Sequence, residues 1–173
     1  LPDCEVVLNP KPEEGMISSI RLAARKIPEG FSALVSLVDT PEIEHWMIVR
    51  LRAAITREEK AVILIPRYED GDGHPVILSP RGLARLADPI PRGLKTLIEI
   101  AGPCAVRVPF GGLRPLDCEL PETYEDLVAR HEKKSLAPPP PSPALSLLFS
   151  TGLFFLAAAA GGFFDGAPIL RRS

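Results

Sequence analysis

The sequence has no excess of basic charge and few aromatic side chains, and both shortages exclude function classes. Its 173 residues include 20 Lys and Arg against 22 Asp and Glu, which gives a formal net charge of -2. Binding to nucleic acid relies on basic side chains that neutralise phosphates, so a general nucleic-acid-binding role has no support. Aromatic residues make up 6% of the chain, too few to indicate platforms on which unpaired bases would stack.

Cysteine is also scarce. The three cysteines, Cys4, Cys104 and Cys118, are odd in number, far apart and free of any CxxC pair. This pattern predicts neither a disulfide framework nor a zinc knuckle. Reduced, buried thiols fit it best, and with no signal-peptide pattern in the sequence we expect a cytoplasmic protein.

What the sequence does contain is an alternation of strand and helix patterns. Phe31–Val38 and Ala61–Ile65 are nearly continuous apolar runs, typical of strands buried on both faces. Further strands are expected at 5–8, 76–78 and 104–108, and helices at 16–27, after Pro41, and at 80–87, 91–101 and 121–133. This order predicts an α/β fold with a mostly parallel sheet in a three-layer arrangement.

Several local details follow from the same patterns. Thr40 and Pro41 suit the N-cap and first position of the helix after the first apolar run. The segment 66–73 is polar and glycine-containing, so we expect a loop. In the closing helix we expect Tyr124, Leu127 and Val128 to face inward.

The last forty residues differ from the rest. We expect a domain at 1–134, a proline-rich linker at 135–143 and an apolar tail at 144–173. Residues 144–164 are 21 positions without a charge, and a bilayer requires roughly 20. Membrane contact through this segment, a disordered tail and an out-of-frame extension all remain open.

An acidic residue, Asp39, follows the first buried strand directly. In open α/β sheets ligands bind at the carboxyl ends of the strands, and a carboxylate there can hold Mg²⁺ against phosphate oxygens. Support of the next helix by Asp39 is an equally good explanation.

Three other segments carry residues that are candidates for binding or catalysis. Gly73-His74-Pro75 permits close backbone approach and places an imidazole at a turn, although an ordinary tight turn explains it too. Asp117 or Glu119 is a candidate second carboxylate, although acidic residues also stabilise a helix start. Asn9 with the segment 14–20 suits either an anion or base site at a helix start or simple capping.

Together and in this order, these segments resemble the MobA-like nucleotidyltransferases of molybdenum-cofactor maturation, above all those that attach a cytidylyl or guanylyl group to molybdopterin. That family shows patterns like N-P…G-M-x-x-S-I, L-x-D-x-P, P-x-Y…G-H-P-V and D-x-D-T-P-E-D-Y. The matching positions lie within residues 4–130: Asn9-Pro10, Gly15-Met16 with Ser19-Ile20, Asp39 with Pro41, Pro66 with Tyr68, Gly73–Val76 and Asp117–Tyr124.

The resemblance implies a Rossmann-like nucleotidyltransferase fold. It also implies transfer of a nucleoside monophosphate from an NTP, CTP or GTP being favoured, to a small phosphorylated, molybdopterin-like acceptor, with release of pyrophosphate and use of Mg²⁺. Asp39 would be the central metal ligand and a catalytic residue, with Glu119 as the second ligand. The other implied site residues are His74 as a catalytic residue, and Asn9, Gly15, Met16, Ser19, Gly73 and Pro75 as nucleotide- or substrate-binding residues.

Three departures from the family pattern lower the activity that we expect. Glu119 replaces an Asp and Leu120 replaces a Thr. The family's N-terminal strand and its L-x-A-G-x-S-x-R-M-G-x-x-K-like phosphate loop are not found, so we expect an N-terminally truncated sheet that lacks a central strand. A non-catalytic nucleotide-binding or regulatory fragment is therefore the alternative function.

Overall fold

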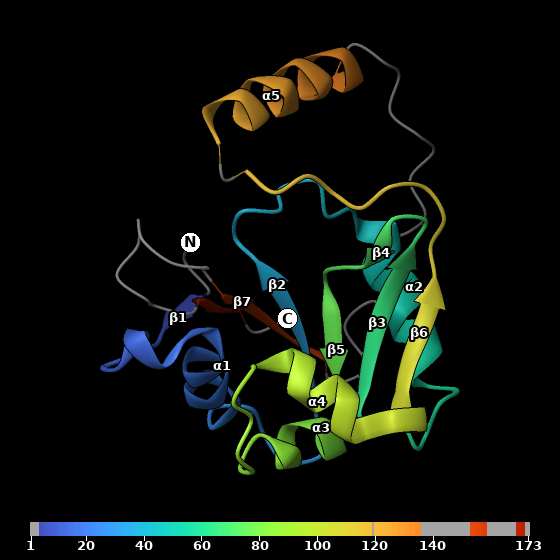
Figure 1. The fold of residues 1–173 in the computed structure, drawn as a ribbon. Helices are drawn as coiled ribbons and strands as arrows, with labels where there is room; N and C mark the ends of the chain where they lie inside the picture. The colour runs from blue at the N-terminus through green and yellow to red at the C-terminus, as the bar shows by residue number, and fades with distance from the viewer. Residues whose placement is uncertain (1–3, 119, 136–152, 159–168, 172–173) are drawn as a thin grey trace.

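One mixed sheet runs through the structure. The computed structural model describes residues 4–118, 120–135, 153–158 and 169–171, and in them eight strands form a sheet in the order β1-β8-β7-β2-β5-β3-β4, with β6 on the other side of β3 (Figure 1). The strands are β1 (Cys4–Val6), β2 (Ser32–Leu37), β3 (Ile63–Tyr68), β4 (Gly71–Asp72), β5 (Val76–Leu78), β6 (Ala105–Pro109), β7 (Leu153–Ala158) and β8 (Ile169–Arg171).

Helices cover both faces of this sheet. They are η1 (Pro12–Glu14), α1 (Met16–Ala24), α2 (His45–Ile55), α3 (Pro80–Arg85), α4 (Leu94–Ala101), η2 (Gly102–Cys104) and α5 (Pro121–Ser135). In Figure 1, α1, α3 and α4 lie in front of the sheet, α2 lies behind it, and α5 lies above the ends of the strands. The three-layer α/β fold and the Rossmann-like class predicted from the sequence are confirmed.

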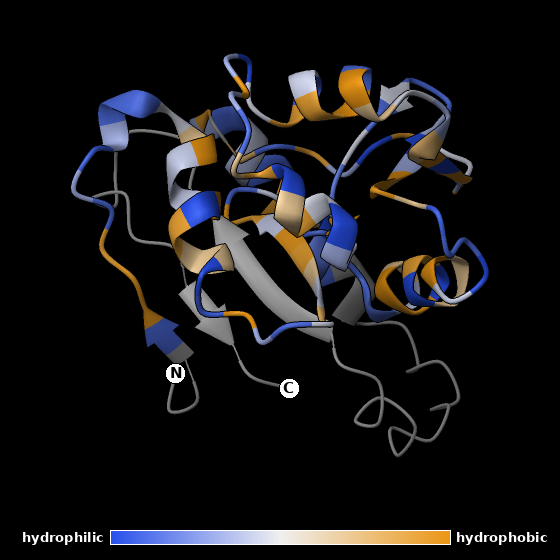
Figure 2. Cartoon of the chain, turned by 90° about the horizontal axis from the view of Figure 1, so that it is seen from below, coloured by the Kyte–Doolittle hydropathy of each residue, from blue (hydrophilic) through white to orange (hydrophobic). Residues whose placement is uncertain are grey.

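The sheet is buried on both faces because its strands alternate between two apolar clusters. Ala33 and Val35 of β2 pack with α1, α3 and α4, whereas Leu34 packs with Met47 and Leu51 of α2. The expectation that this apolar run forms a strand buried on both faces is confirmed. Figure 2 shows hydrophobic and hydrophilic residues side by side on the helices, as expected for helices that cover a sheet.

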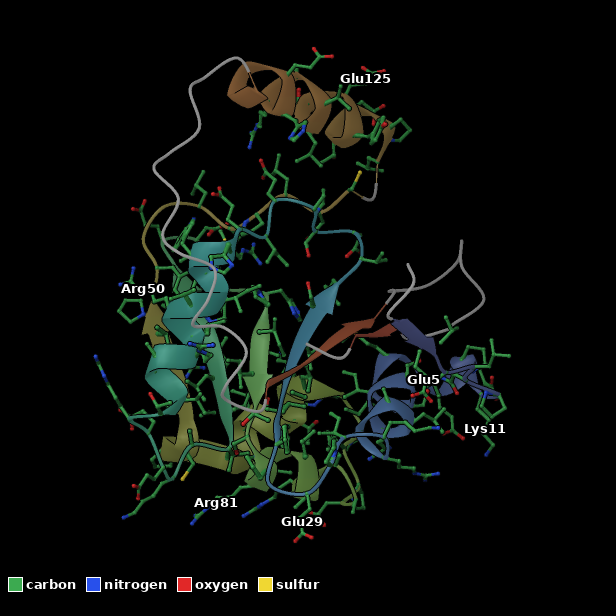
Figure 3. All side chains as sticks on the ribbon, turned by 180° about the vertical axis from the view of Figure 1, so that it is seen from behind. Glu5, Lys11, Glu29, Arg50, Arg81 and Glu125 are labelled. Carbon is green, nitrogen blue, oxygen red and sulfur yellow. The ribbon has the colours of Figure 1, made fainter. Side chains whose placement is uncertain are left out.

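Charged side chains of both signs are spread around this core. The six that Figure 3 labels, Glu5, Lys11, Glu29, Arg50, Arg81 and Glu125, lie on the outside of the ribbon and belong to different parts of the chain. Two of them form ion pairs at the surface: Glu5 pairs with Lys26 at 2.8 Å, and Lys11 pairs with Glu14 at 3.0 Å.

The sheet is mixed, so the prediction of a mostly parallel sheet is wrong in this respect. The pairs β2–β7 and β3–β6 are parallel, but β5 runs antiparallel to both β2 and β3. The reason is local. A short connection through β4 and the His74–Pro75 cis peptide returns the chain beside β3, and so short a connection can only join antiparallel neighbours.

Two element boundaries also differ from the predictions. Helix α2 begins at His45 with Glu44 as its N-cap, not at Pro41, because the Thr40 hydroxyl donates to the carbonyl of Leu37 at 3.0 Å and closes a turn instead. Strand β3 continues through Pro66 to Tyr68, where we expected a loop. Pro66 has no N–H to donate, and its main-chain oxygen accepts a hydrogen bond from Gly73 at 3.1 Å.

The closing helix is less buried than expected. In α5 only Leu127 of the three predicted inward residues is buried, at 7% exposure, whereas Tyr124 is 60% and Val128 38% exposed. Figure 1 gives the reason: α5 lies beyond the carboxyl ends of the strands and not against a face of the sheet.

Part of the apolar tail belongs to the sheet. Residues 153–158 form β7, which pairs with β2 in parallel over six residues, and residues 169–171 form β8, which pairs with both β7 and β1. The rest of the segment 144–164 lies outside the described residues. In the described part of the chain, no helix combines the length and the apolar content needed to cross a membrane.

Close packing of α3 against Val62, the residue before β3, gives a direct test of this fold. A Cβ at Gly82 would lie 2.1 Å from the main-chain oxygen of Val62, which cannot move without disturbing the sheet. We expect Gly82→Ala to lower the free energy of unfolding by roughly 1–3 kcal/mol. Urea unfolding measures it, with Arg81→Ala at the exposed neighbouring position as the control, and equal midpoints for the two variants would contradict the packing.

Candidate functional site

The loops that follow β2, β3 and β6 meet at one edge of the sheet. These three strands point in the same direction, since β3 is parallel to β6 and antiparallel to β5, which is itself antiparallel to β2. A cavity of about 680 Å³ opens at this edge. Its apolar wall includes Met16, Ile65 and Val76, and its polar wall includes Thr40 and His74. Such a cavity is of the size that takes a nucleotide or a comparable ligand.

Asp39 lies in the turn that ends β2. Its main-chain oxygen accepts a hydrogen bond from the N–H of Cys118 at 2.7 Å, which ties the loop after β6 to the end of β2. Its side-chain Oδ1 atom is buried and has no hydrogen-bond partner among the described residues. Because α2 begins only at His45, Asp39 does not support the start of that helix. A buried carboxylate oxygen without a donor is available to a cation.

His74 lies next to this carboxylate. Burial lowers the pKa of its imidazole below the ordinary value, although a hydrogen bond to the main chain of Val35 and the charges of Asp117 and Asp39 act in the opposite direction. Its Nδ1 atom is buried without a hydrogen-bond partner in the described part of the chain. The structure therefore brings Asp39, His74 and Asp117 within electrostatic reach of one another.

Asp117 is a second carboxylate near His74 and Asp39. The other carboxylates of the cavity wall, Glu14, Asp70 and Asp72, are each ion-paired with a basic side chain. Asp117 lines the cavity and is exposed to solvent, and the adjacent Cys118 is the residue hydrogen-bonded to Asp39. Glu119, the second metal ligand implied by the family resemblance, lies outside the described residues.

The donor set suits a hard divalent cation that keeps several waters. Within the described ranges, no group of three or more His, Cys, Asp or Glu side chains is gathered closely enough to hold a metal by itself. Mg²⁺ does not need such a group, because it is commonly held by one or two carboxylates together with water and substrate phosphates. The unpartnered Oδ1 of Asp39, with Asp117 nearby, fits this requirement.

Tyr68 holds the turn that carries His74. The Tyr68 hydroxyl donates to the main-chain oxygen of His74 at 3.2 Å, and burial together with the charge of Asp70 raises the pKa of this phenol to about 12. Gly73 lies against the same ring, since a Cβ there would approach the Tyr68 ring to 2.9 Å. The predicted site residues Gly73 and His74 both line the cavity, while Pro75 follows them through a cis peptide bond.

Of the four residues near α1 that were predicted to bind the nucleotide, some fix the start of α1 and one lines the cavity. The Asn9 amide donates to the hydroxyls of Ser18 at 2.7 Å and Ser19 at 3.0 Å, so Asn9 and Ser19 belong to a buried network that fixes the start of α1. Gly15 is the N-cap of α1, at φ 81°. Met16 is the member of this set that lines the cavity.

Three basic residues of the cavity wall were missed from the sequence. Arg92 pairs with Glu99, and Arg114 pairs with Asp70 at 3.0 Å. Lys95, in the first turn of α4, also lines the cavity, and it forms no ion pair among the described residues. The run Pro91–Lys95 lies far from the acidic motifs in the sequence, and its helical pattern carries no functional motif, so only the fold reveals its position at the cavity.

The buried imidazole predicts how stability depends on pH. Because the pKa of His74 is lower in the folded protein than in the unfolded chain, the unfolded chain takes up the proton first as the pH falls below the ordinary His value. We expect the free energy of unfolding to decrease with falling pH in this range, and to decrease less steeply in His74→Gln. Urea titrations between pH 7 and 5 with a chelator present measure both slopes, and equal slopes would contradict the burial of a neutral imidazole.

Comparisons with known proteins agree with this geometry. A sequence model described as the MobA-like NTP transferase domain matches residues 1–105. No curated protein matches the chain.

Solved structures give the same fold. An Rv0371c homologue from Mycobacterium sp. strain JC1 has a TM-score of 0.57 at 25% identity, covering 67% of this chain and 58% of that one. Rv0371c from Mycobacterium tuberculosis H37Rv has a TM-score of 0.55 at 24% identity, covering 65% and 59%. A complex of Rv0371c with manganese has a TM-score of 0.50 at 24% identity. The chain spans less than two thirds of the length of these structures. Because the family model matches more than half of the chain, the chain belongs to the MobA-like NTP transferase domain family.

Proposed function

We propose that this chain binds a metal–NTP complex at the carboxyl edge of its sheet and transfers the nucleoside monophosphate to an acceptor, releasing pyrophosphate. The observation that carries the proposal is the buried Oδ1 of Asp39, which has no partner among the described residues and lies in a turn whose residues Leu37 and Thr40 line a cavity of about 680 Å³. Family membership supplies the reaction class. In nucleotidyl transfer the acceptor oxygen forms a bond to the α-phosphorus, and the bond to the pyrophosphate oxygen breaks.

Asp39 and Asp117 are the residues that we assign to the metal, with Glu119 as a further candidate. When bound, Mg²⁺ or Mn²⁺ would neutralise phosphate charge and orient the phosphate oxygens. A solved structure of the similar Rv0371c is a complex with manganese, which supports the use of a divalent cation. The short link from Cys118 to the main chain of Asp39 would hold the two aspartates in a fixed relation, and phosphoryl transfer depends on such positioning.

His74 is assigned to the acceptor side of the site. Since its pKa is lowered, the imidazole is neutral near pH 7 and can accept a proton from an attacking hydroxyl or phosphate. Gly73 and Pro75 fix the turn that presents this ring. The apolar wall around Met16, Ile17 and Ile65 would contact a planar ring of the nucleotide or of the acceptor.

Lys95 is the basic side chain that we assign to the phosphates. Arg92 and Arg114 already pair with carboxylates, so within the described residues Lys95 is the cation of the cavity wall that forms no ion pair. We also propose that the acceptor is molybdopterin-like and that the NTP is CTP or GTP. The acceptor would carry a phosphate, as the NTP does. Asn9, Gly15 and Ser19 would act indirectly by fixing the start of α1.

A non-catalytic nucleotide-binding module is the second candidate. It is favoured because Lys95 is the one basic side chain of the cavity wall without an ion pair among the described residues, whereas nucleotidyl transfer commonly uses more than one positive group on the triphosphate. Binding of Mg²⁺–NTP without release of pyrophosphate in the presence of a phosphorylated pterin acceptor would identify it.

Replacing Asp39 tests the metal assignment. Asp39→Asn keeps the shape of the side chain but removes its charge, so we expect Mg²⁺–CTP and Mg²⁺–GTP to bind more than about tenfold more weakly. Isothermal calorimetry measures the affinity, with the exposed Asp88→Asn as the matched control. Equal affinities for wild type and Asp39→Asn would rule out Asp39 as the metal ligand.

Replacing Lys95 tests the phosphate assignment separately. A charge-assisted hydrogen bond contributes about 1.5–3 kcal/mol, so Lys95→Ala should weaken binding of Mg²⁺–NTP by about ten- to a hundredfold. Lys60→Ala, exposed and outside the cavity, is the control. If Lys95→Ala weakens the binding of nucleoside and NTP equally, Lys95 does not contact the phosphates.

A further inference from the structure

The loop that follows β6 is fixed to the edge of the sheet by alternate main-chain N–H groups. Four of these groups donate to neighbouring oxygens at 2.7–3.2 Å, three to a carboxylate and the last to a main-chain oxygen: Gly112 to Glu69, Arg114 to Asp70, Leu116 to Glu42 and Cys118 to Asp39. A loop without helix or strand is thereby held in one position. Its two charged side chains, Arg114 and Asp117, are held with it.

The guanidinium group of Arg114 is anchored through one of its three nitrogens. Its Nε donates to Oδ2 of Asp70 at 3.0 Å, and this hydrogen bond lowers the pKa of the Asp70 carboxyl. Its two terminal nitrogens form no hydrogen bond or ion pair with the described residues. The side chain is half exposed and lines the cavity. A guanidinium group held in this way has a pair of donors available to an anion.

Gly73 makes room for this side chain. Its φ is not in the positive range, so its backbone conformation does not require a glycine. A Cβ at this position would instead lie 3.2 Å from Cδ of Arg114 and 2.9 Å from Cε2 of Tyr68. The missing side chain therefore lets Arg114 lie against the turn that carries His74, and both side chains line the cavity.

Arg114 also lies close to a residue that we assign to the metal. It precedes Asp117 by three residues, so their Cα atoms are at most about 11 Å apart, and both line the same cavity. Lys95, which we assign to the phosphates of the NTP, belongs to α4. Two cations thus reach the cavity from different elements of the fold and can serve two phosphate-bearing ligands.

We propose that Arg114 binds the phosphate monoester of the acceptor, with its two terminal nitrogens donating to two phosphate oxygens while Asp70 holds its Nε. This inference rests on the proposed function, which assigns His74 to the acceptor side. It adds the residue that would distinguish a phosphorylated acceptor from one that carries only hydroxyl groups. A planar guanidinium group matches the geometry of a phosphate, which a lysine ammonium group at the same place would not.

Binding of a phosphate monoester without metal tests this contact. Phenyl phosphate is the probe, EDTA removes divalent cations, and amide chemical shifts of the isotope-labelled full chain measure the affinity. Arg114→Ala removes charge-assisted hydrogen bonds made by a half-exposed group, so we expect it to weaken phenyl phosphate binding about fivefold or more. Arg114→Gln, which keeps part of the aliphatic stem beside Gly73, gives the same test should Arg114→Ala not fold.

Arg107 supplies a matched control. Its Nε donates to Oδ2 of Asp72 at 3.0 Å, and its side chain is 46% exposed against 50% for Arg114. Arg107 is not among the residues that line the cavity. Arg107→Ala therefore removes the same charge and the same kind of ion pair, and it should bind phenyl phosphate like wild type. Unchanged binding in Arg114→Ala, or equal losses in the two variants, would overturn the proposal.

Binding of Mg²⁺–CTP and Mg²⁺–GTP separates this inference from the proposed function. Because Asp39 and Lys95 are assigned to the NTP, Arg114→Ala should bind it within about twofold of wild type. An equal loss of NTP and phenyl phosphate affinity would assign Arg114 to the triphosphate and overturn the inference.

The two ligands also distinguish the two failures. If wild type binds no NTP but binds phenyl phosphate through Arg114, the proposed function fails and the phosphate site at Arg114 stands. If wild type binds NTP, and its binding of phenyl phosphate does not depend on Arg114, the proposed function stands and the inference fails.

Discussion

Strand β2 must be covered on both faces and on both edges, and most of the structure follows from this constraint. Leu34 on one face requires α2, Ala33 and Val35 on the other require α1, α3 and α4, and the two edges require β5 and β7. A strand held on four sides has little freedom to shift. The turn that follows it, and with it Asp39, therefore has a fixed position at the edge of the sheet.

The chemistry of the candidate site depends on the side-chain oxygen of Asp39, which has no hydrogen-bond partner among the described residues. The loop after β6 reaches across the edge and is tied to Asp39 by the Cys118 N–H, which brings Asp117 close without giving the Asp39 carboxylate a donor. His74 arrives from the turn between β4 and β5, desolvated enough to be neutral. A neutral imidazole and a lysine that line one cavity, with a buried acidic oxygen next to the imidazole, are a suitable set for holding and transferring a phosphate-bearing group.

Much of the fold could be predicted from the sequence, because the apolar runs of β2 and β3 and the helical spacing of α1 and α4 record burial directly. Features decided by single hydrogen bonds could not. Thr40 is a residue type that favours the N-cap position, yet its hydroxyl closes the turn with Leu37. Proline usually ends a strand, but Pro66 lies within β3. Asp39 and His74 were predicted from motif order, whereas Lys95 was not, because only the packing of α4 brings it to the cavity. The apolar segment 153–158 was ambiguous because a buried strand and a membrane segment have the same composition.

The account centres on a divalent cation at the end of β2, supported by a strand from the other end of the chain. Paramagnetic broadening of backbone amide signals by Mn²⁺, in the presence of CTP or GTP, tests both parts in one measurement. We predict the strongest broadening at residues 39–40, 74 and 117–118, together with broadening at 157–158 at the end of β7. Broadening centred elsewhere, or broadening that includes Asp39 but spares residues 157–158, would contradict the account.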